Sequence, residues 1–384
     1  MKIYFDNAAT TRAFDEVCGT LTDMMKTEYY NPSSPYSSAI NADKKLDESR
    51  DIILKSLNMK GRLIFTSGGS ESNNLAIKGA LKKLRNAKII TSETEHPSVK
   101  NTCMQAAKET NAELLIIPVD SMGYVKKEEF ADACQNAETA LISIMHVNNE
   151  TGTIQPIEEL ARIAKQNIKN CVFHSDGVQA FLKAEPLGKS SMVDMYTISG
   201  HKVHGPKGVG ALYVKDTRLI EAVTQGGGQE DGLRSGTYNT PSIAAFAKAV
   251  EMLGQNHNAY IDTMHSIKKT IIGALDKSDI DYVVCGDAIE KSAPHILNIA
   301  FRDIMGEVLL SALDAGGLIA NTGSACSSKK TVVSPILKSM GVDDKYIKGA
   351  IRLSFGAFST ADDAQWAAQI IIENVARLRR YKRA

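Results

Sequence analysis

The 384-residue chain lacks the long apolar run that a membrane span needs. No window approaches the roughly 18 consecutive apolar residues of a transmembrane helix, and MKIYFDNAATT (1–11) holds no apolar run of signal-peptide length. An excess of one charge is missing too, since 45 basic residues face 44 acidic ones and the formal net charge is +1. Bulk electrostatics therefore favour neither nucleic acid nor membrane as a partner. We expect a cytoplasmic protein with no direct membrane binding.

Paired cysteines are also absent. The six cysteines stand at positions 18, 103, 134, 171, 285 and 326, and no two form a CxxC pair. Neither a zinc site nor a disulfide framework is indicated. Five of them lie in apolar or helical surroundings typical of small core residues. Cys326 lies instead in the small, polar stretch NTGSACSSKK (321–330), which is a poor place to bury a thiol.

No internal repeat or low-complexity linker interrupts the chain, and from about Leu63 to Val214 β-rich runs alternate with amphipathic helical patterns. This alternation predicts an α/β fold with a mainly parallel sheet covered by helices on both faces. Only a glycine-rich loop separates the last two candidate strands, so one of them could run antiparallel. The candidate strands are RLIFTSG (62–68), AKIITSE (87–93), ELLIIPVD (113–120), ALISIMHVNN (140–149), CVFHSD (171–176), MYTISG (195–200) and GALYVK (210–215).

The pattern changes after a long helical stretch from about Ser242 to Lys277. The segments that follow are typical of a smaller α+β unit, and we place a domain boundary near residue 260. These segments are HILNIAFRD (295–303), GEVLLSALDAGGLIA (306–320), AIRLSFGAFS (350–359) and ADDAQWAAQIIIENVARLRRY (361–381).

Polar groups follow five of the candidate strands. Ligands of open α/β sheets bind outside the carboxyl ends of the strands, so these groups predict one composite site. They are SGGS (67–70), Glu95 with His96, Asn148 with Asn149, Asp176 with Gln179, and SGHK (199–202).

The last of these groups begins the stretch SGHKVHGPKG (199–208). A phosphate-binding P-loop requires GxxxxGK followed by Ser or Thr, whereas Lys202 precedes the glycines and Val203 follows it, so a P-loop is rejected. A metal site on His201 and His204 would need carboxylates or thiolates nearby, and the stretch contains none. Taken alone, Lys202 would be interpreted as a surface lysine in a turn.

Its neighbours at the other strand ends favour covalent chemistry instead. A lysine buried at a strand end can lose its proton and form a Schiff base, and pyridoxal 5'-phosphate is the common cofactor held in this way. Asp176 can keep the proton on the pyridine nitrogen, and His96 lies where a ring could cover the cofactor face. TSGGSESNN (66–74) places small residues before a helical pattern, with Ser70 as a helix cap and phosphate ligand.

Further motifs run through nearly the whole chain: YFDNAATT (4–11), SGGSESNN (67–74), TEHPSV (94–99), HVNNETG (146–152), HSDGVQ (174–179), SGHKVHGPKGVGALYV (199–214), GGGQEDGLRSGT (226–237), GSACSS (323–328) and IRLSFG (351–356). These motifs, and their order along the chain, resemble those of the cysteine desulfurases of the NifS and IscS type. SGHK and GSAC are the most specific of these motifs.

The resemblance implies a homodimeric, pyridoxal-phosphate-dependent transferase of fold type I, the aspartate-aminotransferase fold. Residues 15–260 would form a large domain around a mainly parallel seven-stranded sheet. Residues 1–14 and 261–384 would form a small α+β domain that carries the catalytic cysteine. Such an enzyme takes sulfur from L-cysteine, leaves L-alanine and passes the sulfur to iron–sulfur assembly, tRNA thiolation or thiamin synthesis. Its partner would be a scaffold protein or a tRNA-thiolation enzyme.

The resemblance also implies individual roles. Lys202 would be the Schiff-base lysine, Cys326 the sulfur acceptor, and His96 a ring stacked on the cofactor that also takes part in proton transfer. Arg352, with Asn149 beside it, would bind the substrate carboxylate, a task suited to the guanidinium fork. Cofactor contacts are implied for Gly69, Ser70, His96, Asn149, Asp176, Gln179, Ser199, His201, Lys202 and, from the other subunit, Thr237.

Two alternatives stay open at this point. An aminotransferase or a selenocysteine lyase on the same fold would use the same lysine and aspartate. A non-catalytic sulfur-carrier module would bind pyridoxal phosphate without turnover. The identity of the partner protein that receives the sulfur from Cys326 is open as well. So is the preference between cysteine and selenocysteine.

Overall fold

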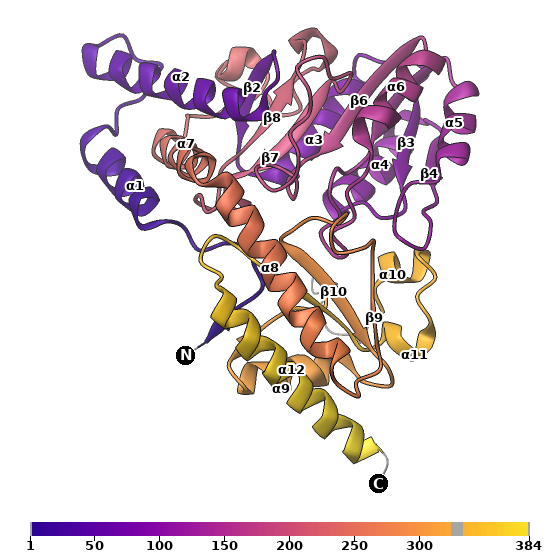
Figure 1. Cartoon of the computed structure of the whole chain (residues 1–384). Helices are drawn as coiled ribbons and strands as arrows, with labels where there is room; N and C mark the ends of the chain where they lie inside the picture. Colours follow the sequence, from indigo (N-terminus) through magenta and orange to yellow (C-terminus); the bar gives the residue numbers. More distant parts are fainter. Residues whose placement is uncertain (1, 324–332, 383–384) are drawn as a thin grey trace.

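The computed structural model describes residues 2–323 and 333–382. A seven-stranded sheet of order β2-β8-β7-β6-β5-β3-β4 occupies the upper part of Figure 1. β8 runs antiparallel to β2 and β7, and the other neighbours pair in parallel. The predicted α/β fold is confirmed, and the strand after the glycine-rich loop runs against its neighbours. The strands are β2 (Arg62–Thr66), β3 (Lys88–Ser92), β4 (Leu114–Ile117), β5 (Thr139–Ser143), β6 (Asn170–Asp176), β7 (Met195–Ser199) and β8 (Gly210–Val214).

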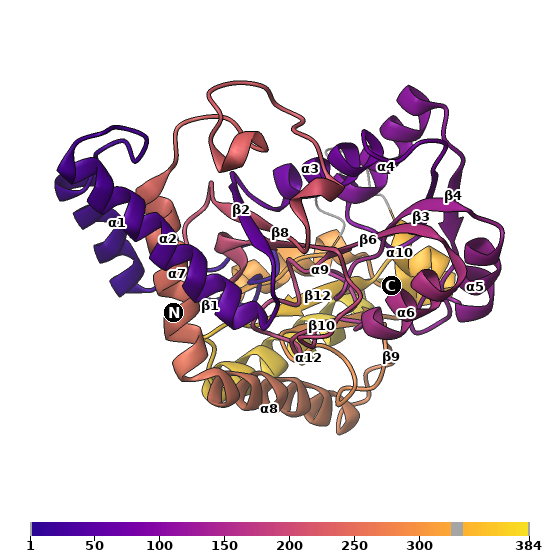
Figure 2. The same cartoon turned by 90° about the horizontal axis from the view of Figure 1, so that it is seen from above.

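Helices cover both faces of this sheet, because successive strand residues point to opposite sides and both sides are apolar. Leu63 and Phe173 pack on the side of α1, α2, α5, α6 and α7. Their neighbours Ile64 and Val172 pack on the side of α3 and α4 (Figure 2). The helices are α1 (Asp15–Thr27), α2 (Ser37–Leu57), α3 (Gly69–Leu81), α4 (Pro97–Thr110), α5 (Lys127–Gln135), α6 (Ile157–Asn167) and α7 (Thr240–Gln255).

The lower part of Figure 1 is a smaller α+β unit built on an antiparallel sheet of order β12-β10-β9. β1 (Ile3–Tyr4) joins it from the N-terminus by pairing in parallel with β11 (Leu318–Ile319). α8 and α12 pack together over its apolar core. The remaining elements are α8 (His257–Asp276), β9 (Tyr282–Val284), β10 (Ile296–Phe301), α9 (Gly306–Ala315), α10 (Pro335–Ser339), α11 (Asp344–Ile347), β12 (Ala350–Ser354) and α12 (Ala361–Lys382), and short 3₁₀ turns are η1 (Gly200–Lys202), η2 (Thr217–Leu219) and η3 (Glu230–Gly232).

The long helical stretch expected over residues 242–277 is two helices. α7 ends at Gln255, α8 begins at His257, and Asn256 between them has φ −123° and ψ 23°. Asparagine competes with the helix for backbone hydrogen bonds, which favours a break at this position. After the break, α8 leaves the large sheet and crosses to the smaller unit (Figure 1). None of the helices in the described ranges combines the length and apolar content needed to cross a bilayer.

Candidate active site

A cavity of about 350 Å³ lies where several strands of the large sheet end, and its size is typical of a small-molecule site. Thr237 lines a different cavity, of about 210 Å³, and Cys326 lies outside the described residues. The structure brings the other expected site residues together in the wall of the first cavity: Gly69, Ser70, His96, Asn149, Asp176, Gln179, Ser199, His201, Lys202 and Arg352.

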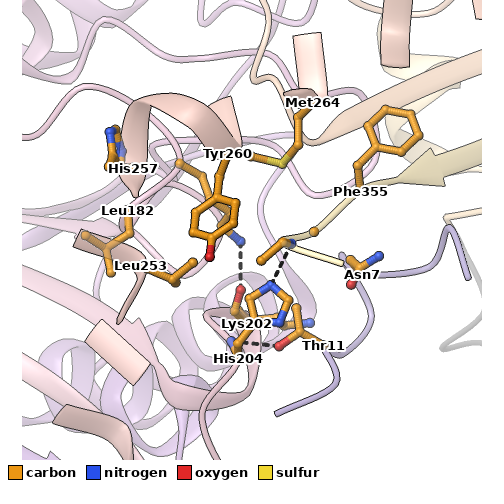
Figure 3. A pocket seen from close by; sticks show the side chains of 13 residues that line it. Asn7, Thr11, Leu182, Lys202, His204, Leu253, His257, Tyr260, Met264 and Phe355 are labelled. Atoms are coloured by element: carbon orange, nitrogen blue, oxygen red, sulfur yellow. Dashed lines mark hydrogen bonds between the residues drawn. The ribbon is translucent and has the colours of Figure 1, made fainter. Parts of the chain in front are cut away.

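Lys202 lies on η1, directly after β7. Its Nζ donates to the carbonyl oxygens of Ala8 at 2.6 Å and Ala9 at 2.7 Å, so the N-terminal segment borders the amine. The Lys202 carbonyl oxygen accepts a hydrogen bond from Nζ of Lys183 at 3.2 Å. Lys202 also borders a second cavity (Figure 3). That second cavity measures about 20 Å³, which leaves room for one water molecule. The larger cavity is therefore the candidate active site.

Asp176 ends β6 with both carboxylate oxygens held in place. Oδ1 accepts from the backbone N–H of Val178 at 3.0 Å. Oδ2 accepts from Nδ2 of Asn73 at 2.8 Å. The residue is 5% exposed and lines the cavity, so these two donors fix a buried carboxylate against the ligand space.

His96 caps the N-terminus of α4, where its Nδ1 accepts the backbone N–H of Ser98 at 3.1 Å. Burial lowers the pKa of His96, and the charge of Lys202 acts in the same direction while Asp176 opposes both. The ring is therefore neutral at pH 7, which suits stacking against an aromatic ligand.

The start of α3 contributes Gly69 and Ser70 to the cavity wall. Gly68 is the N-cap, with φ 152° and ψ −177°, a conformation accessible to glycine. A Cβ on Gly69 would lie 2.8 Å from Cγ2 of Val178, so a side chain there would press on the cavity wall. The expected role of Ser70 as the helix cap is wrong, because α3 already begins at Gly69. Ser70 still lines the cavity at a helix N-terminus, where anions bind.

His201 and Ser199 also line the cavity. Burial lowers the pKa of His201 to about 4, with further contributions from Lys202, Lys207 and Lys183, so the imidazole is neutral at pH 7. Its Nδ1 lies 3.2 Å from Oγ1 of Thr10. These groups provide hydrogen bonds rather than an additional positive charge.

Arg352, on β12, has a side chain that is only 4% exposed. Its Nη2 lies 2.7 Å from Oδ1 of Asp6, and its Nη1 donates to the carbonyl oxygen of Asn149 at 3.0 Å. Asn321 donates to the other oxygen of Asp6 at 3.0 Å. The guanidinium plane is therefore held by two partners from distant parts of the chain.

The amide of Gln179 is oriented by three contacts. Its Nε2 donates to the carbonyl oxygen of Ala8 at 2.9 Å. Its Oε1 lies 3.2 Å from Nζ of Lys183 and 3.2 Å from Nε2 of His295, so both neighbours act as donors to it. These contacts fix the orientation of the amide, with Nε2 as its donor and Oε1 as its acceptor.

Four buried polar atoms in the cavity wall have no hydrogen-bond partner in the described part of the chain: Oδ1 of Asn73, Oδ1 of Asn149, Oγ of Ser199 and Nε of Arg352. An unpaired buried polar atom costs about 1–3 kcal/mol, and such atoms in a native wall call for an explanation. A polar ligand that brings donors and acceptors supplies their partners. Pyridoxal phosphate with an amino-acid substrate fits this wall.

Some of these residues were not expected from the sequence. Asp6, the carbonyl groups of Ala8 and Ala9, Asn73 and Ser98 all contact a predicted site residue. A signal for Asn73 was present, because it follows Ser70 by three positions on a predicted helix and so shares its face. Asp6 had no such local signal, since its partner Arg352 is 346 residues away.

The sequence profile of the aminotransferase class-V family matches residues 3–366. The chain belongs to this family, and membership implies pyridoxal phosphate as the cofactor.

Known relatives narrow the assignment. A cysteine desulfurase IscS of Clostridium botulinum is 35% identical over 374 residues, which cover 96% of this chain and 93% of the relative. The solved structure of a NifS-like protein matches with a TM-score of 0.90 and 33% identity over 98% of this chain and 100% of that one. SspA, solved in complex with cysteine, matches with a TM-score of 0.78 and 30% identity over 94% of this chain and 100% of that one. Within the class-V family the chain is a cysteine desulfurase of the NifS and IscS type. The family, fold and enzyme class expected from the sequence are confirmed.

Proposed function

We propose that this enzyme removes the sulfur atom of L-cysteine, releases L-alanine and holds the sulfur as a persulfide on Cys326. The observation that supports this most directly is that Lys202, Asp176 and Arg352 line one cavity. The reaction needs an amine to anchor the cofactor, an acid on its ring nitrogen and a cation for the substrate carboxylate. SspA, at 30% identity, has been solved with cysteine bound, which supports the same substrate here.

Pyridoxal phosphate supplies an electron sink for the charge left on the substrate when its α-proton is removed. Lys202 anchors the cofactor covalently, and Asp176 holds the proton on the pyridine nitrogen. Gln179 and Asn149 would bind the ring oxygen, and His96 would stack on the ring. The phosphate group would be bound at the start of α3 by Gly69 and Ser70, together with Ser199 and His201.

The remaining steps are assigned to two side chains. Lys202 would move the α-proton of the substrate. The Cys326 thiolate then attacks the substrate sulfur, and the sulfur–carbon bond breaks with its electron pair on carbon, which is protonated to give alanine. Cys326 is three residues after Gly323 in the sequence, and Gly323 lines the cavity, which supports access of the thiol to the substrate.

We also propose the domain division 15–260 against 1–14 with 261–384. All buried members of the apolar core under α8 and α12 fall in the second set, which supports this division.

The enzyme acts as a homodimer in which the partner's Thr237 reaches the phosphate group. Within one subunit Thr237 lines a cavity other than that of Lys202, in agreement with a role across the interface. The five described cysteines are free thiols, which supports the cytoplasm as location.

Product analysis tests the activity. With L-cysteine and a thiol reductant, the enzyme is expected to form alanine and sulfide in equal amounts. Parallel reactions with selenocysteine and with a keto acid plus an amino donor test the two related activities. Transamination without sulfide release would show an aminotransferase, and cofactor binding without any turnover would show a carrier module.

The acceptor of the sulfur is a scaffold protein of iron–sulfur assembly or a tRNA-thiolation enzyme. Incubation with cysteine labelled at sulfur, followed by addition of each candidate, identifies the acceptor as the protein that takes the label from Cys326.

Replacement of Arg352 tests substrate recognition. Arg352→Ala is expected to raise KM for L-cysteine by about 30-fold to several thousand-fold, because losing one partner of a buried charge pair costs about 2–5 kcal/mol. Steady-state kinetics measure the effect. Arg352→Lys is the matched variant: it keeps the charge but loses the planar fork, so we expect an intermediate KM. The cofactor spectrum verifies that both variants still bind pyridoxal phosphate. An unchanged KM in Arg352→Ala would remove Arg352 from the substrate site.

A further inference from the structure

A chain of hydrogen bonds links Asp176 to His96 through Asn73 and Ser98. Nδ2 of Asn73 lies 2.8 Å from Oδ2 of Asp176 and 2.8 Å from Oγ of Ser98. Oγ of Ser98 lies 2.7 Å from Nδ1 of His96, and the backbone nitrogen of Ser98 lies 3.1 Å from the same atom. Asn73 on α3 can contact Ser98 on α4 because these two helices lie side by side (Figures 1 and 2).

The chemistry of the donors sets the direction of this chain. A backbone N–H can only donate, so Nδ1 of His96 accepts from Ser98 and carries no proton. The amide nitrogen of Asn73 can only donate, and its two hydrogens go to Asp176 and to the Ser98 hydroxyl. Since that hydroxyl already accepts from Asn73, its own hydrogen is available for Nδ1. The single proton of a neutral His96 is therefore on Nε2.

The surroundings of His96 favour the neutral form. Burial is the largest influence lowering its pKa, and of the two charged groups that act on it, Asp176 raises the pKa and Lys202 lowers it. Burial also raises the pKa of the adjacent Glu95 to about 8, so Glu95 is largely uncharged at pH 7. His96 caps the N-terminus of α4, and the helix dipole disfavours an imidazolium there.

We propose that Asn73 and Ser98 are positioning residues that hold His96 as the neutral Nε2–H tautomer, a hydrogen-bond donor to the ligand in the cavity. The proposal deepens the proposed function and rests on it. An imidazole whose remaining nitrogen carries the proton polarises a ligand group and does not take a proton from that group. Removal of the α-proton is then left to Lys202.

The tautomer can be measured directly in the cofactor-loaded protein. Nitrogen-15 spectra of protein labelled in histidine separate protonated from unprotonated ring nitrogens, and the variant His96→Gln assigns the His96 signals. We expect an unprotonated Nδ1 and a protonated Nε2 at pH 7. Ser98→Thr keeps the hydroxyl and is expected to keep this pattern.

Two asparagine variants test the role of this series of hydrogen bonds. Asn73→Asp replaces the donor by an acceptor and adds a negative charge, so the pKa of His96 is expected to rise and the tautomer preference to weaken. Asn74→Asp is the matched control, since it adds the same charge one residue along α3, where Nδ2 of Asn74 only donates to the backbone oxygen of Ser70. We expect a clearly smaller shift in the control. If Asn73→Asp does not fold, the pKa of His96 is compared between Ser98→Ala and Ser98→Thr. Only Ser98→Ala is expected to shift this pKa.

A proton on Nδ1 of His96, an imidazolium at pH 7, or equal shifts in Asn73→Asp and Asn74→Asp would overturn the proposal. These spectra do not depend on turnover. A protein with the expected tautomer but no sulfur release would contradict the proposed function and leave the assignment of Asn73 and Ser98 intact.

Discussion

The variant Lys202→Ala is expected to lose the yellow colour of lysine-bound pyridoxal phosphate. Its rate of sulfur release is expected to fall by about 10²–10⁴-fold. The reason is that one amine performs two tasks, covalent attachment of the cofactor and transfer of the α-proton. The amine lies in the cavity, where the carbonyl oxygens of Ala8 and Ala9 hold it, and alanine cannot replace it in either task. Absorbance spectra after addition of pyridoxal phosphate, together with a sulfide assay, measure both losses.

Lys207→Ala is the control for this experiment, because Lys207 lies in the same connection between β7 and β8 but is exposed. It is expected to keep the colour and the turnover. Borohydride reduction of the unaltered enzyme, followed by peptide mass mapping, should locate the cofactor on Lys202. A Lys202→Ala protein that retains the colour would refute the assignment.

The second large effect is expected for Cys326→Ser, which should keep the colour but lose sulfur release by about 10³-fold or more. A serine hydroxyl is not ionised at neutral pH and cannot carry a persulfide. The spectrum of the bound cofactor and the yield of sulfide and alanine separate the two properties in one sample.

The remaining cysteines are poor substitutes for Cys326. Burial raises the pKa of the Cys103, Cys134, Cys171 and Cys285 thiols to about 12, so these thiols stay protonated at neutral pH and react weakly. Cys18 is exposed on α1 and does not line the cavity. Cys18→Ser is therefore the matched control and is expected to retain turnover. Undiminished sulfur release in Cys326→Ser would exclude Cys326 as the nucleophile.

Much of the large sheet was predictable, because its signals are local. Apart from the edge strand β4, where Ile116 is exposed, the strands are short, mainly apolar runs that are mostly buried. Each helix between strands has its own amphipathic pattern. The rule that ligands bind at the carboxyl ends of strands then placed Asp176 and the stretch up to Lys202 near one site. The break at Asn256 and the cap at Gly68 were not predicted, since they depend on the backbone conformation of single residues.

The sequence by itself therefore determined the family, the order of the strands along the chain and the residue types of the site. Only the tertiary structure decided which groups orient them: Asp6 beside Arg352, the Ala8 and Ala9 carbonyl groups beside Lys202, and Asn73 with Ser98 behind His96. The physical reason is that these contacts join segments up to 346 residues apart. Apart from the local contact of Ser98 with His96, such pairs meet only once the helices and the N-terminal segment are packed against the sheet, and no local pattern records that packing.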